Sequence, residues 1–181
     1  ELAQVNYAAL EKVQTRTLEV NGYPVILQFN PERIRSSAAK IDKQSLAARP
    51  CFLCEANRPG NQRWIDFGEE YQIMVNPYPI FREHLTIPIR AHLEQRISSR
   101  YKDMLSLAEA LTDFIIFYNG PKCGASAPDH MHFQAGNKGF LPLETNWRKA
   151  RKEVVFSYGE ATLFALRDFL QPMFVLVSGD K

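Results

Sequence analysis

The stretch of residues 129–134 constrains the fold more than any other part of the chain. Polar and apolar side chains alternate there, in the order Asp-His-Met-His-Phe-Gln. In a β-strand, alternate side chains point to the same face of the sheet. The alternation therefore predicts a strand with His130, His132 and Gln134 on one face and with the apolar residues anchored in a core. The chain has 4 histidines, so two on one strand face indicate a functional site; structural histidines are the alternative.

A loop rich in small residues precedes this strand. Residues 119–126 read Asn-Gly-Pro-Lys-Cys-Gly-Ala-Ser, and its glycines let the backbone come close to a ligand. Successive amides in such a turn can bind an anion, and a lysine adds positive charge. A plain connection between two elements is the alternative. We expect a phosphate-binding loop with these candidate residues: Asn119, Gly120, Lys122, Gly124 and Ser126.

The segment His130-Met131-His132-Phe133-Gln134 resembles the His-x-His-x-Gln signature of the histidine-triad superfamily. It is similar to the transferase branch, which includes galactose-1-phosphate uridylyltransferases, dinucleoside-tetraphosphate phosphorylases and GDP-hexose phosphorylases. Residues 75–79 and 84–88 resemble the strand pair of the family, and residues 51–54, Cys-Phe-Leu-Cys, resemble its zinc-binding cysteine pair. The resemblance covers residues 50–136. Met131 stands where the uridylyltransferases have proline, so the similarity to the phosphorylases is stronger.

The resemblance implies a nucleotidyltransferase or phosphorylase that acts through a covalent nucleotidyl-histidine intermediate. His132 would be the nucleophile, and a neutral imidazole suits this role because its unperturbed pKa is about 6.5. Gln134 would donate a hydrogen bond to a phosphoryl oxygen. In this superfamily, glutamine at that position marks transferases, whereas a third histidine is typical of hydrolases.

The resemblance also implies the substrates and partners. The donor would be a nucleoside-diphosphate sugar or a dinucleoside polyphosphate, and the acceptor phosphate or a sugar 1-phosphate. Many transferase relatives are longer. If this chain is a fragment or a reduced form of them, another subunit, as in a homodimer, would supply the acceptor site. Two alternatives stay open: a nucleotide hydrolase of the same superfamily, and a zinc-stapled nucleotide-binding module without turnover.

The spacing of Cys51 and Cys54 suits a metal site. The resemblance implies a structural zinc ion held by this pair together with His92 and His130. A redox pair and two inert thiols are the alternatives. The third cysteine is expected to pack within its loop, and His84 is expected at the surface.

Composition excludes several other classes of protein. The net charge of +2, without a long basic run, argues against nucleic acid as a partner. No apolar run approaches the roughly 20 residues of a membrane span. The number of cysteines, 3, is odd, which argues against a disulfide framework. We therefore expect a cytoplasmic protein.

The pattern of elements predicts an α+β fold with a mainly antiparallel sheet and one long helix on a face. Apolar residues at helical spacing predict that helix over residues 101–117. Asn21-Gly22 predicts a two-residue hairpin turn between strands. Residues 1–50 are expected to form an N-terminal hairpin extension packed on the core, and residues 51–181 the nucleotidyltransferase domain. Further strands are expected at residues 71–76, 85–87, 154–157, 162–166 and 174–178.

Overall fold

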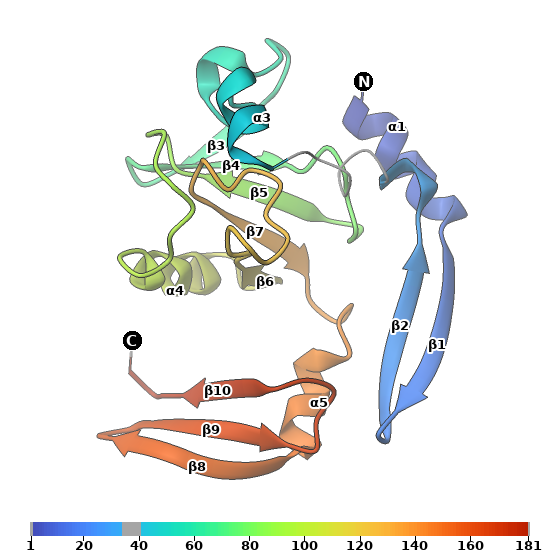
Figure 1. Cartoon of the computed structure of the whole chain (residues 1–181), viewed down its shortest axis with the longest axis vertical. Helices are drawn as coiled ribbons and strands as arrows, with labels where there is room; N and C mark the ends of the chain where they lie inside the picture. The colour runs from blue at the N-terminus through green and yellow to red at the C-terminus, as the bar shows by residue number, and fades with distance from the viewer. Residues whose placement is uncertain (1, 34–40, 181) are drawn as a thin grey trace. The chain divides into compact units, whose positions relative to one another are not determined.

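The computed structural model describes residues 2–33 and 41–180 (Figure 1). The chain forms two compact units. The first unit contains Glu1–Val13 and Asn30–Asn137, and the second contains Gln14–Phe29 and Lys138–Lys181. The functional domain boundary after residue 50 stays a prediction.

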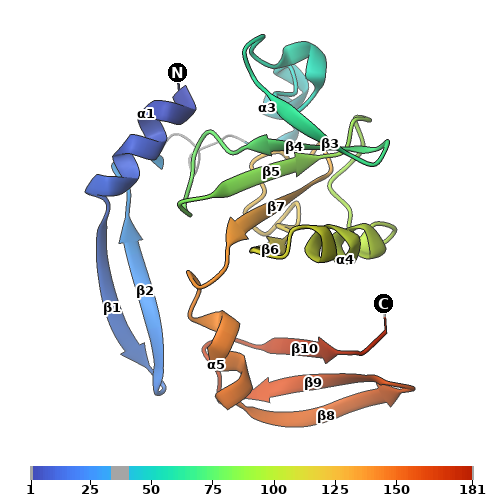
Figure 2. The same ribbon diagram turned by 180° about the vertical axis from the view of Figure 1, so that it is seen from behind.

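A five-stranded antiparallel sheet forms the centre of the first unit, with the strand order β3-β4-β5-β7-β6 (Figures 1 and 2). The strands are β3 (Trp64–Phe67), β4 (Tyr71–Val75), β5 (His84–Pro88), β6 (Phe114–Phe117) and β7 (His132–Asn137). Pro88 pairs with His132, and Thr86 pairs with Gln134. Because paired residues share a face, these four side chains lie on the same side of the sheet.

Helix α4 (Tyr101–Ala110) covers the opposite face of this sheet (Figure 1). Its Leu107 is fully buried in one cluster with Ile87, Met131 and Phe133. Each such side chain contributes about 1.5–3 kcal/mol when it leaves water. An antiparallel sheet with its longest helix on one face confirms the predicted α+β class.

The predicted helix over residues 101–117 is wrong in its last part. The helix ends at Ala110, and Phe114–Phe117 forms the edge strand β6. The sequence of β6, Phe-Ile-Ile-Phe, consists of β-branched and aromatic residues, which fit a pleated surface. Its partner is β7, where Phe117 pairs with Gln134. Pairing with a strand this distant in the chain outweighs the local preference for a helix.

Shorter elements complete the first unit. They are α1 (Leu2–Ala9), η1 (Leu10–Lys12), η2 (Pro31–Arg33), α3 (Lys43–Ala48) and η3 (Glu55–Asn57). Helix α1 is fixed to the segment before β5, because Asn6 Nδ2 donates to the carbonyl of Pro77 at 2.7 Å. The hydroxyl of Tyr7 donates to the carbonyl of His84 at 2.9 Å.

The second unit contains the hairpin of β1 (Gln14–Val20) and β2 (Tyr23–Phe29). Asn21 and Gly22 have φ values of 53° and 77°. Two consecutive positive φ angles match the two-residue turn that Asn-Gly favours, so this prediction is confirmed.

A three-stranded antiparallel sheet and one helix form the rest of the second unit (Figure 2). They are α5 (Leu143–Lys149), β8 (Arg151–Tyr158), β9 (Ala161–Arg167) and β10 (Met173–Val177). These three strands confirm the strands predicted at residues 154–157, 162–166 and 174–178. Ala150, Leu166 and Phe169 form the small core of this unit. Within residues 2–33 and 41–180, every helix is too short or too polar to span a lipid bilayer.

Candidate active site and metal centre

Two cysteines and two histidines come together beside the central sheet. The donor atoms of Cys51, Cys54, His92 and His130 all lie within 4.8 Å of one another. Cys51 Sγ lies 3.3 Å from Nδ1 of His130, and Cys54 Sγ lies 3.2 Å from Nδ1 of His92. Ligand atoms around a tetrahedral zinc ion are about 3.3–3.8 Å apart, given the usual zinc–sulfur and zinc–nitrogen bond lengths. The donor set and its spacing therefore fit a metal ion.

The ring of His130 is held in the orientation that a metal ligand needs. Its Nε2 lies 2.7 Å from the carbonyl oxygen of Ile89, to which it donates a hydrogen bond. This bond places the proton on Nε2 and leaves Nδ1 to face Cys51 and Cys54. His130 lies two residues before β7 begins, so it is outside the observed strand, although the alternation predicted it within one. Its ring contacts the two cysteines instead.

Polar groups around the cysteine pair favour a thiolate. Burial raises the pKa of the Cys51 thiol, but the contact with His130 and hydrogen bonds from the amides of Leu53 and Cys54 outweigh it, so the net pKa is lowered. Burial and the neighbouring Cys51 raise the pKa of Cys54. The pair thus favours one thiolate next to one thiol. Arg58 Nε closes the turn by donating to the carbonyl of Leu53 at 2.9 Å.

His132 is buried at the start of β7, with its ring fixed by a main-chain atom. Its Nδ1 lies 2.8 Å from the carbonyl oxygen of His130. A carbonyl has no proton to give, so Nδ1 carries the proton and Nε2 keeps its lone pair. Burial lowers the pKa of His132, which favours the neutral ring. The side chain can therefore act as a nucleophile through Nε2.

The amide of Gln134 is oriented by a second buried histidine. The amide N–H of Ile80 donates to Nδ1 of His84 at 3.2 Å, so Nε2 of His84 carries the ring proton. Nε2 in turn donates to Oε1 of Gln134 at 3.1 Å. The oxygen of the amide therefore faces His84, and its NH2 group is directed away as a donor.

The prediction that His84 lies at the surface is wrong. Its side chain is 1% exposed, and the ring of Phe81 packs against it with centroids 5.3 Å apart. Burial lowers the pKa of His84 to about 4. Neither the pairing of β5 with β7 nor the position of Phe81 is visible in the local sequence.

The candidate phosphate loop follows β6 directly. The main-chain oxygen of Asn119 accepts a hydrogen bond from Gln95 Nε2 at 2.9 Å, which ties the start of the loop to the site. Gly124 has a φ of 88°, a conformation that favours glycine. Gly120 and Ser126 are half-buried, while Lys122 is exposed. The binding roles of these residues stay predictions.

Cys123, expected to pack in the loop, is exposed. An ion pair that sequence reasoning missed joins Arg49 to Asp129 at 2.8 Å. Since these residues come shortly before Cys51 and His130, the pair holds together the two segments that carry the metal-site candidates.

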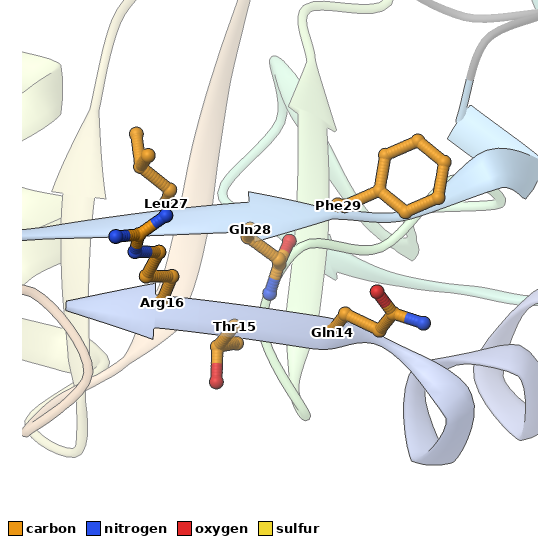
Figure 3. A pocket seen from close by; sticks show the side chains of 6 residues that line it. All are labelled: Gln14, Thr15, Arg16, Leu27, Gln28 and Phe29. Atoms are coloured by element: carbon orange, nitrogen blue, oxygen red, sulfur yellow. The ribbon is translucent and has the colours of Figure 1, made fainter.

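A shallow hollow lies elsewhere, on the hairpin of the second unit (Figure 3). Its lining consists of Gln14, Thr15, Arg16, Leu27, Gln28 and Phe29. All cysteines and histidines of the sequence belong to the first unit.

The sequence model of a protein family, described as a domain of unknown function (DUF4922), matches residues 1–137. The chain belongs to the DUF4922 family. The matched segment includes both the metal-site candidates and the His-x-His-x-Gln strand of this DUF4922 protein. None of the curated protein sequences matches it.

Solved structures similar to the DUF4922 chain come from histidine-triad proteins and from a phosphorylase. A histidine triad protein from Clostridium difficile has 16% sequence identity to this chain and a TM-score of 0.36. The match covers 51% of this chain and 90% of the histidine triad protein. Yeast Ap4A phosphorylase in complex with Ap4A has 17% identity and a TM-score of 0.48, covering 93% of this chain. The match spans 65% of the phosphorylase chain.

Proposed function

We propose that this DUF4922 protein transfers a nucleotidyl group through a covalent bond to Nε2 of His132. The hydrogen bond of 2.8 Å between Nδ1 of His132 and the carbonyl of His130 carries this proposal. It assigns the ring proton to Nδ1 and so leaves Nε2 as the nucleophilic atom. Burial favours the neutral ring in which that lone pair exists.

The proposed reaction has two steps at one phosphorus atom. In the first, Nε2 attacks the α-phosphorus of the donor, and the bond from this phosphorus to the bridging oxygen of the leaving group breaks. A sugar 1-phosphate or a nucleoside polyphosphate departs, and the nucleotidyl group stays on His132. In the second, an oxygen of the acceptor attacks the same phosphorus, the phosphorus–nitrogen bond breaks, and the imidazole is restored.

Hydrogen bonds around the ring suit these steps. Attack makes the ring of His132 cationic, and the carbonyl of His130 stabilises the N–H that then carries this charge. The NH2 group of Gln134, on the same sheet face as His132, would donate to a phosphoryl oxygen. An amide neither accepts nor releases a proton near neutral pH, which favours transfer to an acceptor over activation of water.

The substrate classes come from the motif resemblance. The donor we propose is a nucleoside-diphosphate sugar or a dinucleoside polyphosphate, and the acceptor is phosphate or a sugar 1-phosphate. The phosphate groups would contact Asn119, Gly120, Lys122, Gly124 and Ser126. The homodimer and the cytoplasmic location stay predictions.

We also propose that the cluster of Cys51, Cys54, His92 and His130 holds a structural zinc ion. The compact set of two sulfur and two nitrogen donors supports this ion over harder cations. Four protein ligands fill a tetrahedral site, so its contribution is to folding and to the position of His130.

An intact-mass measurement tests the proposed function. The protein is mixed without acceptor, separately with GDP-, UDP- and ADP-hexoses and with dinucleoside tetraphosphates, and is quenched without acid because phosphoramidates are acid-labile. We expect an adduct of one nucleoside monophosphate, whose mass identifies the base. His132→Ala should form no adduct while keeping its fold and its metal.

Other outcomes separate the alternatives. An adduct that persists in His132→Ala, or no adduct with any donor, would contradict the proposal. Release of free nucleotide in water without acceptor would indicate the hydrolase. Binding of the donor without an adduct would indicate the nucleotide-binding module.

A further inference from the structure

One buried amide side chain contacts three main-chain groups of the candidate site. Gln95 is 1% exposed. Its Oε1 accepts from the amide N–H of His132 at 2.7 Å. Its Nε2 donates to the carbonyl of His132 at 3.1 Å and to the carbonyl of Asn119 at 2.9 Å. Gln95 thus binds both backbone polar groups of the candidate nucleophile and the first residue of the candidate phosphate loop.

The main chain of Gln95 is itself fixed. Its amide N–H donates to the carbonyl of Pro128 at 3.2 Å, and its carbonyl accepts from the hydroxyl of Tyr118 at 2.9 Å. A side chain whose main chain is hydrogen-bonded on both sides and whose amide group has all its partners has little freedom to rotate. Its amide therefore holds the main chain of His132 and that of Asn119 at a fixed distance from each other.

These contacts are costly to lose. The amide N–H of His132 donates its hydrogen bond to a side chain 37 residues away in the sequence. Each main-chain group left buried without a partner costs about 1–3 kcal/mol. Without Gln95, the start of β7 would move to find other partners, and the ring of His132 would move with it.

We infer that Gln95 is a positioning residue, which sets the placement of Nε2 of His132 relative to the loop that begins at Asn119. This inference rests on the proposed function of His132. Gln95 touches neither the ring of His132 nor the atoms that would react, and it acts through the backbone. A displacement of about 1 Å in such a placement can lower a rate about 100-fold.

Two substitutions and one matched control test this role. Gln95→Met keeps the length of the side chain but removes all three hydrogen bonds. Gln95→Glu keeps an acceptor for the amide of His132 but loses both donors. The control, Gln44→Met, makes the same substitution at an exposed glutamine of α3.

The first readout is the rate of His132 adduct formation at saturating donor, measured together with the donor concentration that gives half this rate. For Gln95→Met we expect the rate to fall about 100-fold, whereas the half-saturating concentration changes much less. Gln95→Glu should be intermediate, and Gln44→Met should stay within about threefold of the wild type. Rates for Gln95→Met within threefold of the wild type would overturn the inference.

The second readout does not depend on activity. Hydrogen exchange followed by NMR reports the amide of His132, whose acceptor is the side chain of Gln95. In Gln95→Met this amide should exchange at least about tenfold faster, while amides elsewhere in β7 keep their rates. Unchanged exchange at His132 would overturn the inference. If the wild type forms no adduct with any donor, the proposed function fails, and the exchange comparison still decides whether Gln95 holds His132.

The wild-type protein provides a check that needs no variant. The two NH2 protons of Gln95 both donate to carbonyls inside the protein, so they should exchange slowly with water. Rapid exchange of these protons would contradict the inference even if both Gln95 variants failed to fold.

Discussion

The carbonyl oxygen of His130 lies 2.8 Å from Nδ1 of His132, while the ring of His130 faces the thiols of Cys51 and Cys54. One residue therefore contributes its side chain to the metal-site cluster and its main chain to the candidate nucleophile. A shift of the His130 backbone would therefore change both the metal-site cluster and the atom that orients His132.

Loss of a candidate metal ligand should affect both the metal-site cluster and the candidate nucleophile, His132. We expect Cys51→Ser to lower the bound zinc per chain at least about tenfold, because the thiolate is removed from a four-ligand set. The rate of His132 adduct formation should fall with it, through the carbonyl of His130. Elemental analysis of the purified protein measures the zinc. Cys123→Ser is the matched control, and a similar zinc loss in this exposed-cysteine variant would contradict the assignment.

Stability should depend on pH through His84. Its pKa in the folded protein is about 4, below the value of about 6.5 in an unfolded chain. The unfolded state therefore binds more protons, and the free energy of unfolding should fall as the pH drops from 6.5 towards 4. Between pH 7 and pH 5 we expect a loss of about 2 kcal/mol from this group.

Urea unfolding at several pH values measures this contribution. His84→Asn removes the titrating ring, so its unfolding free energy should change less over the same pH range. Equal pH dependence in wild type and variant would show that His84 contributes nothing.

Gly136 should not tolerate a larger side chain. A Cβ at this position would come within 2.6 Å of the ring of Phe81. We expect Gly136→Ala to lower the free energy of unfolding by about 1–3 kcal/mol, as overpacking does. Gly60→Ala is the control, because a Cβ there meets nothing within 4 Å. Addition of Phe81→Leu to Gly136→Ala should restore part of the loss if the ring is its cause.

The residue at position 134 should control the lifetime of the adduct. Gln134→His places a titratable ring where the amide stands, and general acid–base catalysis typically contributes about 100-fold or more. We therefore expect the adduct of this variant to hydrolyse about 100-fold faster than that of the wild type. Gln134→Met, which carries no exchangeable proton, is the control. Equal lifetimes in the two variants, followed by mass spectrometry after removal of the donor, would argue against this role.

Features encoded by a few neighbouring residues could be predicted from the sequence. The Asn21-Gly22 turn needs only two residues that accept positive φ. The alternation around His132 needs only the two-residue period of a strand. The set of four metal-site candidates followed from the motif resemblance, which carries information about distant contacts that spacing alone does not contain.

Features that depend on distant pairing could not be predicted in this way. Residues 111–117 continue the apolar spacing of α4, yet Phe114–Phe117 pairs with β7 as an edge strand. His84 is buried because β5 pairs with β7 and because Phe81 covers it. Gln95 lies in a polar loop without a local pattern, and its three contacts exist only once that loop meets β7.

The hydrogen-bond chain from Ile80 through His84 to Gln134 runs in one direction. Each donor points towards Gln134, and the last member is an amide that keeps both of its protons at any pH at which the protein is folded. Such a chain can fix the position of an oxygen atom bound beside it, but it cannot carry a proton to or from the solvent. A water molecule that entered the site here would find a hydrogen-bond partner in Gln134, but not a base able to ionise it.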